Sequence, residues 1–241
     1  MKIAHITDIH LSKNLCTKSG INSQNKLSHL LQILNNIRPN YIVLTGDLVA
    51  NGGRDLYLRL YRELRKLKLP IHYCLGNHDN PSFLPKKINC SLLNYRKDIV
   101  SDNHCILFVD TVIYGKTYGI IKKAELIRLK NKLIKYSCKK IILAMHHHPI
   151  KTGFKEIDKH MLLNSQELID LIHDHKSVKC VIFGHTHLNM KIRKKGVQFL
   201  CGPAMVNNWI VKGSRLEKSS EYSAFRLLEL KNRISSRLIS I

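Results

Sequence analysis

The sequence lacks the long apolar runs of exported or membrane-spanning proteins. No window approaches the roughly 18 apolar residues of a membrane span, and residues 1–10 alternate apolar and polar side chains where a secretory signal would be continuously apolar. No Cys-x-x-Cys pair occurs among the seven cysteines, and Cys74, Cys180 and Cys201 lie within apolar runs. These absences predict a soluble, cytoplasmic protein whose thiols are reduced and buried.

Acidic residues are scarce, because 17 Asp and Glu stand against 40 Lys and Arg and leave a net charge of +23. Such an excess attracts anionic substrates, nucleic acid or an anionic membrane surface. The basic residues are spread over predicted helix faces and loops, so an ordinary solvated surface explains them as well. Aromatic residues make up only 7% of the chain, which argues against a stacking platform for nucleic acid.

No repeat, low-complexity segment or linker divides the 241 residues, so we expect a single domain, residues 1–241. The first third of the chain alternates strand and helix patterns, which predicts a βαβαβ unit with a parallel sheet. Its predicted strands are 2–7, 41–45 and 71–75, and its predicted helices are 23–37 and 55–66.

The rest of the chain predicts a second sheet. Further strands are expected at 106–110, 111–114, 141–145 and 178–183, the first two of them paired, and helices at 122–135 and from Asn164 or Ser165 to about His175. Residues 81–102 predict loops and short helices. From Leu188 onward apolar residues alternate, which predicts a largely antiparallel sheet. The expected fold is α/β, with two sheets packed face to face and helices outside.

Five of the apolar runs each end in a cluster of His, Asp or Asn. An open α/β sheet carries its active site at the carboxyl ends of its strands. Each cluster alone is also typical of a loop, a helix cap, a polar turn or a surface patch. Five clusters after five strand-like runs favour one shared site. They are Asp8 with His10, Gly46 with Asp47, Gly76 to Asp79, His146 to Pro149, and Gly184 to His187.

These side chains suit a pair of divalent metal ions held roughly 3.5 to 4 Å apart, which need one bridging oxygen ligand. Asp47 is the expected bridge, because Gly46 lets the backbone turn sharply at the end of a strand. Asp8 and His10, two residues apart on an extended segment, point to the same side and would bind one ion. The remaining ligands are expected to be His187 at the first ion and Asn77, His146 and His185 at the second.

Such an ion pair neutralises the oxygens of a phosphoester and lowers the pKa of a bridging water, so that hydroxide attacks near neutral pH. His78 is then the expected catalytic acid, donating to the leaving oxygen, with Asp79 holding its ring in place.

In the order of its motifs the chain resembles the calcineurin-like metallophosphoesterase family, whose signature runs Asp-x-His, Gly-Asp, Gly-Asn-His-Asp/Glu, a strand-end His and Gly-His-x-His. The resemblance covers nearly the whole chain and implies a four-layer αββα sandwich with two mixed sheets. It implies the same metal ligands, with Asp47 shared, and places His78 next to the substrate phosphate. We expect the substrate to contact His10, Asp47, Asn77, His78 and His187.

Within that family the chain is similar to the bacterial class III cyclic-nucleotide phosphodiesterases, because His-His-His-Pro is followed by Gly153, Asp158, Leu162 and Asn164 at a similar spacing. Alignment of Pro149 with the second Pro of the commoner His-His-Pro-Pro form makes His146 the ligand, with His147 as the alternative. The segment from Gly202 to Trp209 departs from the Pro-Ser-Thr run of related enzymes, which leaves the nucleotide preference open.

We therefore expect a phosphodiesterase that converts 3′,5′-cyclic AMP to AMP with two divalent ions, manganese or iron, zinc also being acceptable to these ligands. One alternative is a nuclease of the same superfamily, favoured by the net charge. A second is a non-catalytic binding module with a decayed metal site, which the complete set of ligands argues against. A small nucleotide is the expected partner, and the oligomeric state is not predicted.

Overall fold

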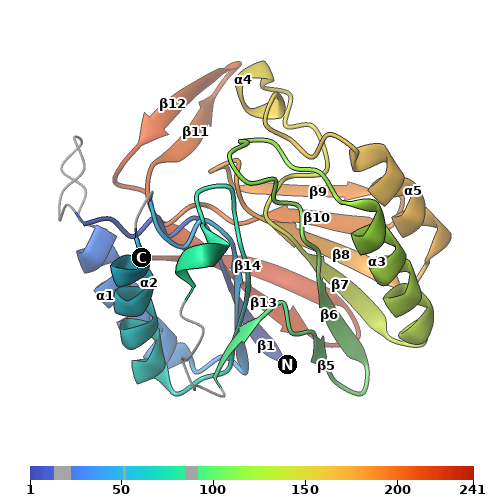
Figure 1. Ribbon diagram of the computed structural model, residues 1–241, viewed down its shortest axis with the longest axis horizontal. Coiled ribbons are helices and arrows are strands. Elements are labelled where there is room, and N and C mark those ends of the chain that lie inside the picture. Colours follow the sequence, from blue (N-terminus) through green and yellow to red (C-terminus); the bar gives the residue numbers. More distant parts are fainter. Residues whose placement is uncertain (14–22, 51–52, 85–91) are drawn as a thin grey trace.

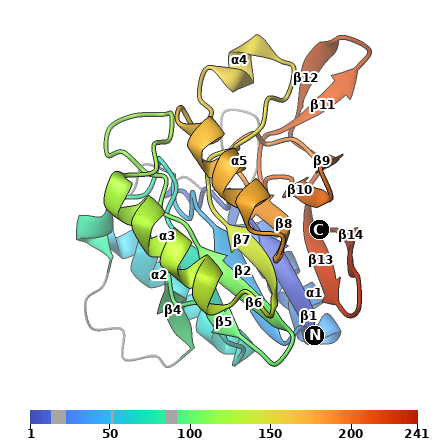
Figure 2. The same cartoon turned by 90° about the vertical axis from the view of Figure 1, so that its right-hand side faces the viewer.

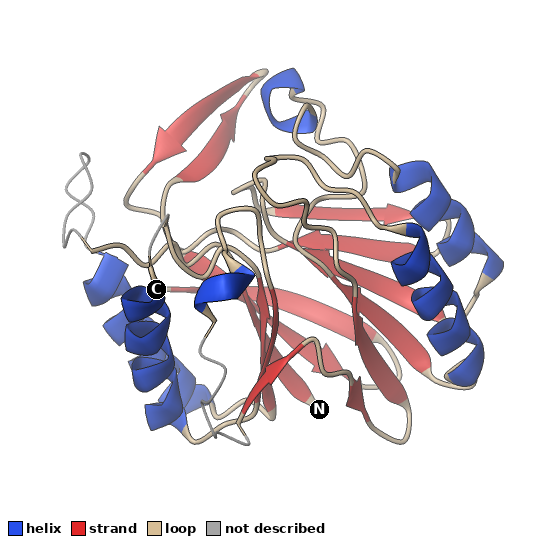
Figure 3. Ribbon diagram, viewed as in Figure 1, coloured by secondary structure: helices blue, strands red, loops and turns tan. Residues whose placement is uncertain are grey.

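The computed structural model describes residues 1–13, 23–50, 53–84 and 92–241. Two six-stranded sheets pack face to face, and helices cover their outer faces, α1 and α2 on one side and α3 and α5 on the other (Figures 1 and 3). This is the four-layer αββα sandwich expected from the sequence.

The first sheet has the strand order β14-β13-β1-β2-β3-β4. Strands β1 to β4 are parallel, whereas β13 and β14 add an antiparallel edge. The strands are β1 (Lys2–Ile6), β2 (Tyr41–Thr45), β3 (Ile71–Cys74), β4 (Leu93–Tyr95), β13 (Ala224–Leu230) and β14 (Ile234–Ser240). The covering helices are α1 (Ser23–Ile37) and α2 (Arg54–Leu64), followed by the short helices η1 (Arg65–Leu67) and η2 (Pro81–Phe83).

The second sheet has the order β5-β6-β7-β8-β10-β9. Its central strands β6, β7, β8 and β10 are parallel, and β5 and β9 are antiparallel edges. The strands are β5 (Ile99–Val100), β6 (His104–Phe108), β7 (Lys140–Ala144), β8 (Val178–Phe183), β9 (Met190–Lys194) and β10 (Val197–Cys201). Helices α3 (Lys123–Lys135) and α5 (Ser165–Asp174) cover it.

Two smaller elements lie together at one end of the sandwich. They are the short helix α4 (Lys155–Asp158) and the separate hairpin of β11 (Asn208–Lys212) and β12 (Arg215–Ser219). Figures 1 and 2, turned by 90° from each other, both show α4 beside this hairpin.

The four layers enclose three apolar cores, and strand residues alternate between them. In β2, Ile42 and Leu44 pack under the helices of the first sheet, whereas Val43 faces the second sheet. In β7, Leu143 packs under α3 and α5, whereas Ile142 faces the first sheet. Because both faces of each central strand are covered, these strands read as continuous apolar runs.

Most predicted elements are confirmed to within one or two residues, but three predictions are wrong, at residues 111–114, in the tail, and at residues 81–102, which contain strands besides loops and a short helix. Residues 111–114 form only an isolated bridge, Val112 to Gly119, because the carboxylates of Asp110 and Glu125 accept the backbone N–H groups of Val112 and Asp110 and replace a strand partner. The tail after Leu188 does not form its own sheet. Its strands extend both sheets, β13 and β14 the first and β9 and β10 the second.

The segment 81–102 contains the edge strands β4 and β5 besides the short helix η2, and residues 85–91 lie outside the described residues. Among the described residues, every helix is too short or too polar to cross a lipid bilayer. Cys74, Cys180 and Cys201 are free and buried.

Arg226 of β13 joins the two sheets from the interior. Its side chain is only 3% exposed, and its guanidinium donates to the carbonyl of Cys201 at 2.7 Å, the carbonyl of Met190 at 2.8 Å and the side chain of Asn189 at 2.5 Å. Burial lowers the pKa of this guanidinium. These hydrogen bonds compensate for its loss of hydration.

Replacement of Arg226 by Ala should lower the free energy of unfolding by about 3 kcal/mol, because it leaves buried acceptors unpaired and opens a cavity between the sheets. Urea unfolding followed by circular dichroism measures this. Arg237→Ala on the neighbouring strand β14, where the side chain is exposed, is the matched control and should change stability by less than about 0.5 kcal/mol. Equal effects of the two substitutions would contradict this role of Arg226.

Candidate metal centre

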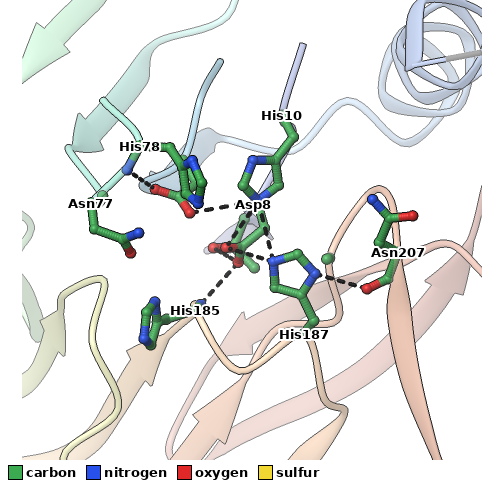
Figure 4. A network of polar contacts seen from close by, with 12 residues as sticks. Asp8, His10, Asn77, His78, His185, His187 and Asn207 are labelled. Carbon is green, nitrogen blue, oxygen red and sulfur yellow. Dashed lines mark hydrogen bonds and ion pairs between the residues drawn. The ribbon is translucent and has the colours of Figure 1, made fainter. Parts of the chain in front are cut away.

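The carboxyl ends of five strands from both sheets meet at one edge of the sandwich. The seven predicted metal ligands follow these strands and gather in one place. Figure 4 labels five of them, Asp8, His10, Asn77, His185 and His187. Asp8 and His10 follow β1, Asp47 follows β2, Asn77 follows β3, His146 follows β7, and His185 and His187 follow β8.

Asp8, His10 and His187 form the first half of the centre. The Nε2 atom of His187 lies 3.2 Å from Nε2 of His10 and 3.4 Å from Oδ1 of Asp8. One ligand atom from each residue lies within 4.8 Å of the other two. Because metal–ligand bonds are about 2 Å long, atoms at this spacing are able to share one ion.

Asn77, His146 and His185 form the second half. Nε2 of His146 lies 3.0 Å from Oδ1 of Asn77 and 3.2 Å from Nδ1 of His185. Two imidazoles and an amide oxygen therefore face one another, and each of them offers a lone pair to a cation.

Asp47 stands between the two halves. Its Oδ2 lies 3.5 Å from Nε2 of His10, and its Oδ1 lies 3.5 Å from Nε2 of His146. Each carboxylate oxygen thus points at one half of the centre, which is the geometry a bridging ligand requires.

Backbone carbonyls orient three of the imidazoles. Nδ1 of His146 lies 2.8 Å from the carbonyl of Thr45, Nδ1 of His187 lies 2.8 Å from that of Asn207, and Nε2 of His185 lies 3.0 Å from that of His160. Because a carbonyl only accepts, the ring nitrogen facing it carries the proton and the other nitrogen turns its lone pair into the centre. No sequence pattern predicts these supports, since the supporting atoms belong to the backbone.

The centre therefore collects acceptors with few donors among them. Oδ1 of Asp8 is buried and lacks a hydrogen-bond partner of good geometry within the described residues. Carboxylate, amide and imidazole lone pairs that converge in this way repel one another unless a cation or protons lie between them. This mixture of oxygen and nitrogen ligand atoms fits divalent transition metals of intermediate softness.

The pKa values of His187, Asp8 and Asp47 reflect the same need for positive charge among these converging lone pairs. Burial opposes a charged His187, but Asp8, the carbonyl of Asn207 and Asp47 together raise the pKa of His187 to about 9. Burial also acts to raise the pKa of Asp8, yet His187 and the other imidazoles bring that pKa well below its ordinary value. Burial and the neighbouring Asp8 raise the pKa of Asp47 to about 7. Since metal ligands must be deprotonated, metal binding here releases protons.

Two glycines of the sequence motifs are required by close packing. A Cβ atom on Gly46, whose φ is +91°, would lie 2.5 Å from Nδ1 of His146. A Cβ atom on Gly184 would lie 1.9 Å from Oγ1 of Thr7 and 2.5 Å from Oδ2 of Asp8. Any larger residue would therefore displace ligands of the centre.

The backbone at the centre departs from the extended conformation expected for Asp8 and His10. Their φ angles are 52° and 45°, and left-handed values recur at Asp47 (50°), His185 (70°) and His187 (54°). Such conformations are costly outside glycine and cluster at functional sites. The loops turn sharply after each strand, so convergence of Asp8 and His10 comes from these turns and not from strand alternation.

His78 and Asp79 follow Asn77 on the same loop but point in different directions. His78 is exposed at the edge of the centre, with its ring centre 5.0 Å from that of His10, and its backbone N–H donates to Oδ1 of Asp47 at 2.9 Å. Asp79, expected to hold the His78 ring, is buried. It accepts hydrogen bonds from the backbone of Gly76 at 2.9 Å, from that of Leu48 at 3.1 Å and from the Tyr57 hydroxyl at 3.0 Å. Asp79 thereby ties together the loops that carry Asp47 and Asn77.

The geometry bears on the choice among the three adjacent histidines. His146 faces both Asp47 and Asn77, as described above. His147 lies behind it, with Nδ1 2.8 Å from the hydroxyl of Thr111. Its ring is 4.6 Å from that of His185, and one ring nitrogen of His147 lies within 4.8 Å of ring nitrogens of His146 and His185. His148 points to Asp158, 3.6 Å away. Contact with the carboxylate of Asp47 favours His146.

Comparison with known proteins agrees with this geometry. Residues 1–189 match the sequence model of the calcineurin-like phosphoesterase family. The chain is 28% identical over 233 residues to a 3′,5′-cyclic-nucleotide phosphodiesterase of Nostoc sp., covering 95% of this chain and 88% of the relative. It is 28% identical over 208 residues to the 3′,5′-cyclic adenosine monophosphate phosphodiesterase of Haemophilus influenzae, covering 85% and 76%.

The fold is shared with a solved structure of a dimetal phosphatase from Danio rerio, at a TM-score of 0.74 and 15% identity, over 100% of this chain and 98% of the other. The resemblance inferred from the motifs is thus confirmed. The chain belongs to the calcineurin-like phosphoesterase family and is a metal-dependent phosphoester hydrolase.

Proposed function

We propose that the protein is a phosphodiesterase with two divalent metal ions that opens a 3′,5′-cyclic nucleotide, converting cyclic AMP to AMP. The observation that carries this proposal is the position of Asp47, with one carboxylate oxygen 3.5 Å from His10 and the other 3.5 Å from His146. The relatives named above as cyclic-nucleotide phosphodiesterases support the substrate class.

Asp8, His10 and His187 would hold one ion, Asn77, His146 and His185 the other, and Asp47 both. The ions, when bound, supply Lewis-acid stabilisation of the phosphoryl oxygens and activation of water. The mixture of nitrogen and oxygen donors suits manganese, iron or zinc. The carbonyls of Thr45, Asn207 and His160 hold three imidazoles in the required orientation.

His78 is the proposed proton donor to the leaving oxygen. Its ring is exposed at the mouth of the centre beside His10, where it is able to reach a substrate phosphate. Its backbone N–H donates to Asp47, and Asp79 closes the turn that contains His78 by accepting from the backbone N–H of Gly76. Backbone contacts of His78 and Asp79 therefore hold the loop that carries the imidazole at the edge of the centre.

One cluster of basic residues lies away from the metal centre and gives no support to a nuclease. Lys140, Lys179, Arg193 and Arg233 line one groove. That groove lies at the amino ends of β7 and β8, whereas the metal ligands lie at their carboxyl ends. Basic residues on that side do not line a path for nucleic acid into the centre. The complete ligand set likewise favours an enzyme over a decayed binding module.

Replacement of Asp47 by Asn removes the bridging charge while keeping the shape of the side chain. We expect bound manganese to fall below two equivalents after reconstitution and kcat for diesters to fall roughly 100-fold or more. Inductively coupled plasma mass spectrometry of the desalted protein measures the equivalents of bound manganese. Asp55→Asn, at an exposed position on α2, is the control and should keep both ions. Full metal content and activity in Asp47→Asn would overturn the two-ion proposal.

Replacement of His78 by Gln should separate catalysis from metal binding. We expect kcat to fall roughly 100-fold to 10,000-fold, the usual contribution of a general acid, with two equivalents of metal retained. A variant that loses its metal as well would show that His78 supports the centre and is not the proton donor.

Purified protein with added Mn²⁺ should hydrolyse both cyclic AMP and bis-p-nitrophenyl phosphate, and a chelator should abolish both activities. Chromatography detects AMP and absorbance detects nitrophenolate. Hydrolysis of the generic diester without any turnover of cyclic AMP would reject the substrate. Steeply salt-dependent cleavage of single-stranded DNA would favour the nuclease.

A further inference from the structure

A cavity opens directly beside the metal centre. It has a volume of about 700 Å³ and lies between the segment that includes α4 on one side and the β11–β12 hairpin on the other. His185 and Thr186, from the loop that also carries His187, line its inner end. Figures 1 and 2 show α4 and the hairpin facing each other at this end of the molecule.

The size of the cavity exceeds what a phosphate group needs. Pockets for small molecules and cofactors measure about 300 to 1,000 Å³, and this one falls within that range. A substrate whose phosphate lies at the metal centre would therefore have room to place an attached organic group between α4 and the hairpin.

The lining suits a planar aromatic group. Trp209 and Phe154, both partly exposed, contribute rings from opposite walls, and Lys155 and Arg215 contribute cationic donors. The ammonium group of Lys218 lies 5.2 Å from the centre of the Trp209 ring and supports it within the hairpin. Nucleobases stack on aromatic side chains, and their ring nitrogens and carbonyls accept hydrogen bonds from Lys and Arg.

Both walls are tied to metal ligands. On the hairpin side, the backbone N–H of Trp209 donates to the carbonyl of His187 at 2.9 Å, and the carbonyl of Asn207 accepts from the ring of His187 at 2.8 Å. On the other side, the carbonyl of His160 accepts from the ring of His185 at 3.0 Å. The distance from each wall to the metal centre is therefore set by the ligands themselves.

Further hydrogen bonds hold the segments that carry these walls. The side chain of Asn208 is buried and bonds the backbone N–H and carbonyl of Ala204, both at 2.7 Å. The carboxylate of Asp158 accepts from the backbone N–H of Thr152 at 2.7 Å and of Gly153 at 3.2 Å. Both contacts involve residues that the sequence analysis singled out, Gly153 and Asp158 in one segment and the Gly202 to Trp209 run in the other.

We infer that this cavity is the nucleoside subsite of the enzyme, in which Trp209 stacks on the base of a nucleotide whose phosphate lies at the metal centre. The inference rests on the proposed function. It adds a specificity-determining residue, because a diester without a base makes no use of the Trp209 ring.

Trp209 is the only tryptophan of the chain, so its fluorescence reports on this cavity alone. AMP added to manganese-loaded protein should quench the emission saturably, because stacked bases quench indole, whereas ribose 5-phosphate, which has no base, should not. Ile210→Ala, at an exposed position with the opposite orientation on β11, is the matched control and should keep the quenching. Absence of quenching by AMP would overturn the inference without any measurement of turnover.

A kinetic experiment tests the role in selectivity. Trp209→Ala should lower the ratio of kcat/KM for cyclic AMP to that for methyl p-nitrophenyl phosphate by roughly 10-fold or more, the usual effect of losing one stacked base. Trp209→Phe, which keeps a smaller ring, should lower the ratio less, and Ile210→Ala should leave it unchanged. Circular dichroism and manganese content verify that each variant is folded and loaded.

Failure of the subsite and failure of the proposed function give different results. An equal loss for both substrates in Trp209→Ala would show that the Trp209 ring only supports the hairpin beside the metal centre, and it would reject the subsite while leaving the phosphodiesterase intact. If the wild type turned over neither diester, the proposed function would fail, and the fluorescence titration would still decide whether the cavity binds a nucleotide.

Discussion

The structure depends on one electrostatic constraint, the convergence of lone pairs from both sheets on a small volume around Asp47. Carboxylate, amide and imidazole acceptors meet there with their protonated nitrogens turned outward to backbone carbonyls. In a buried environment, such an arrangement is unfavourable without positive charge. The raised pKa of His187 reflects this demand. The hydrogen bonds and the close-packed glycines around the centre hold these groups together against their mutual repulsion.

The fold meets this constraint by dividing the ligands between two sheets. Strands β1, β2 and β3 carry ligands of one sheet and β7 and β8 those of the other, so the centre exists only while the sheets stay packed. The core between the sheets and the buried Arg226 maintain that packing. Left-handed backbone at five of the predicted ligand residues is the local cost of bringing the loops together. Regular structure thus supplies the stability that the strained loops lack.

The elements that sequence analysis predicted best are those with a strong, local pattern. Helix α1 and strands β2 and β8 have the predicted bounds, because helical periodicity and short apolar runs report local burial directly. The same patterns failed at residues 111–114 and in the tail. Alternation shows which face of a strand is buried but not which strand it pairs with, so β10 could not be placed parallel to β8 or β13 against β1.

The sequence by itself determined which side chains meet at the centre, since the residue types, their order and their position after strands already predict a shared site around Asp47. The tertiary structure decided what depends on direction in space. It turned Asp79 away from His78 toward the backbone, placed His146 rather than His147 against Asp47, and set α4 opposite Trp209. Spacing along a chain fixes only which side of an element a residue occupies, whereas these contacts join elements far apart in sequence, and packing alone brings them together.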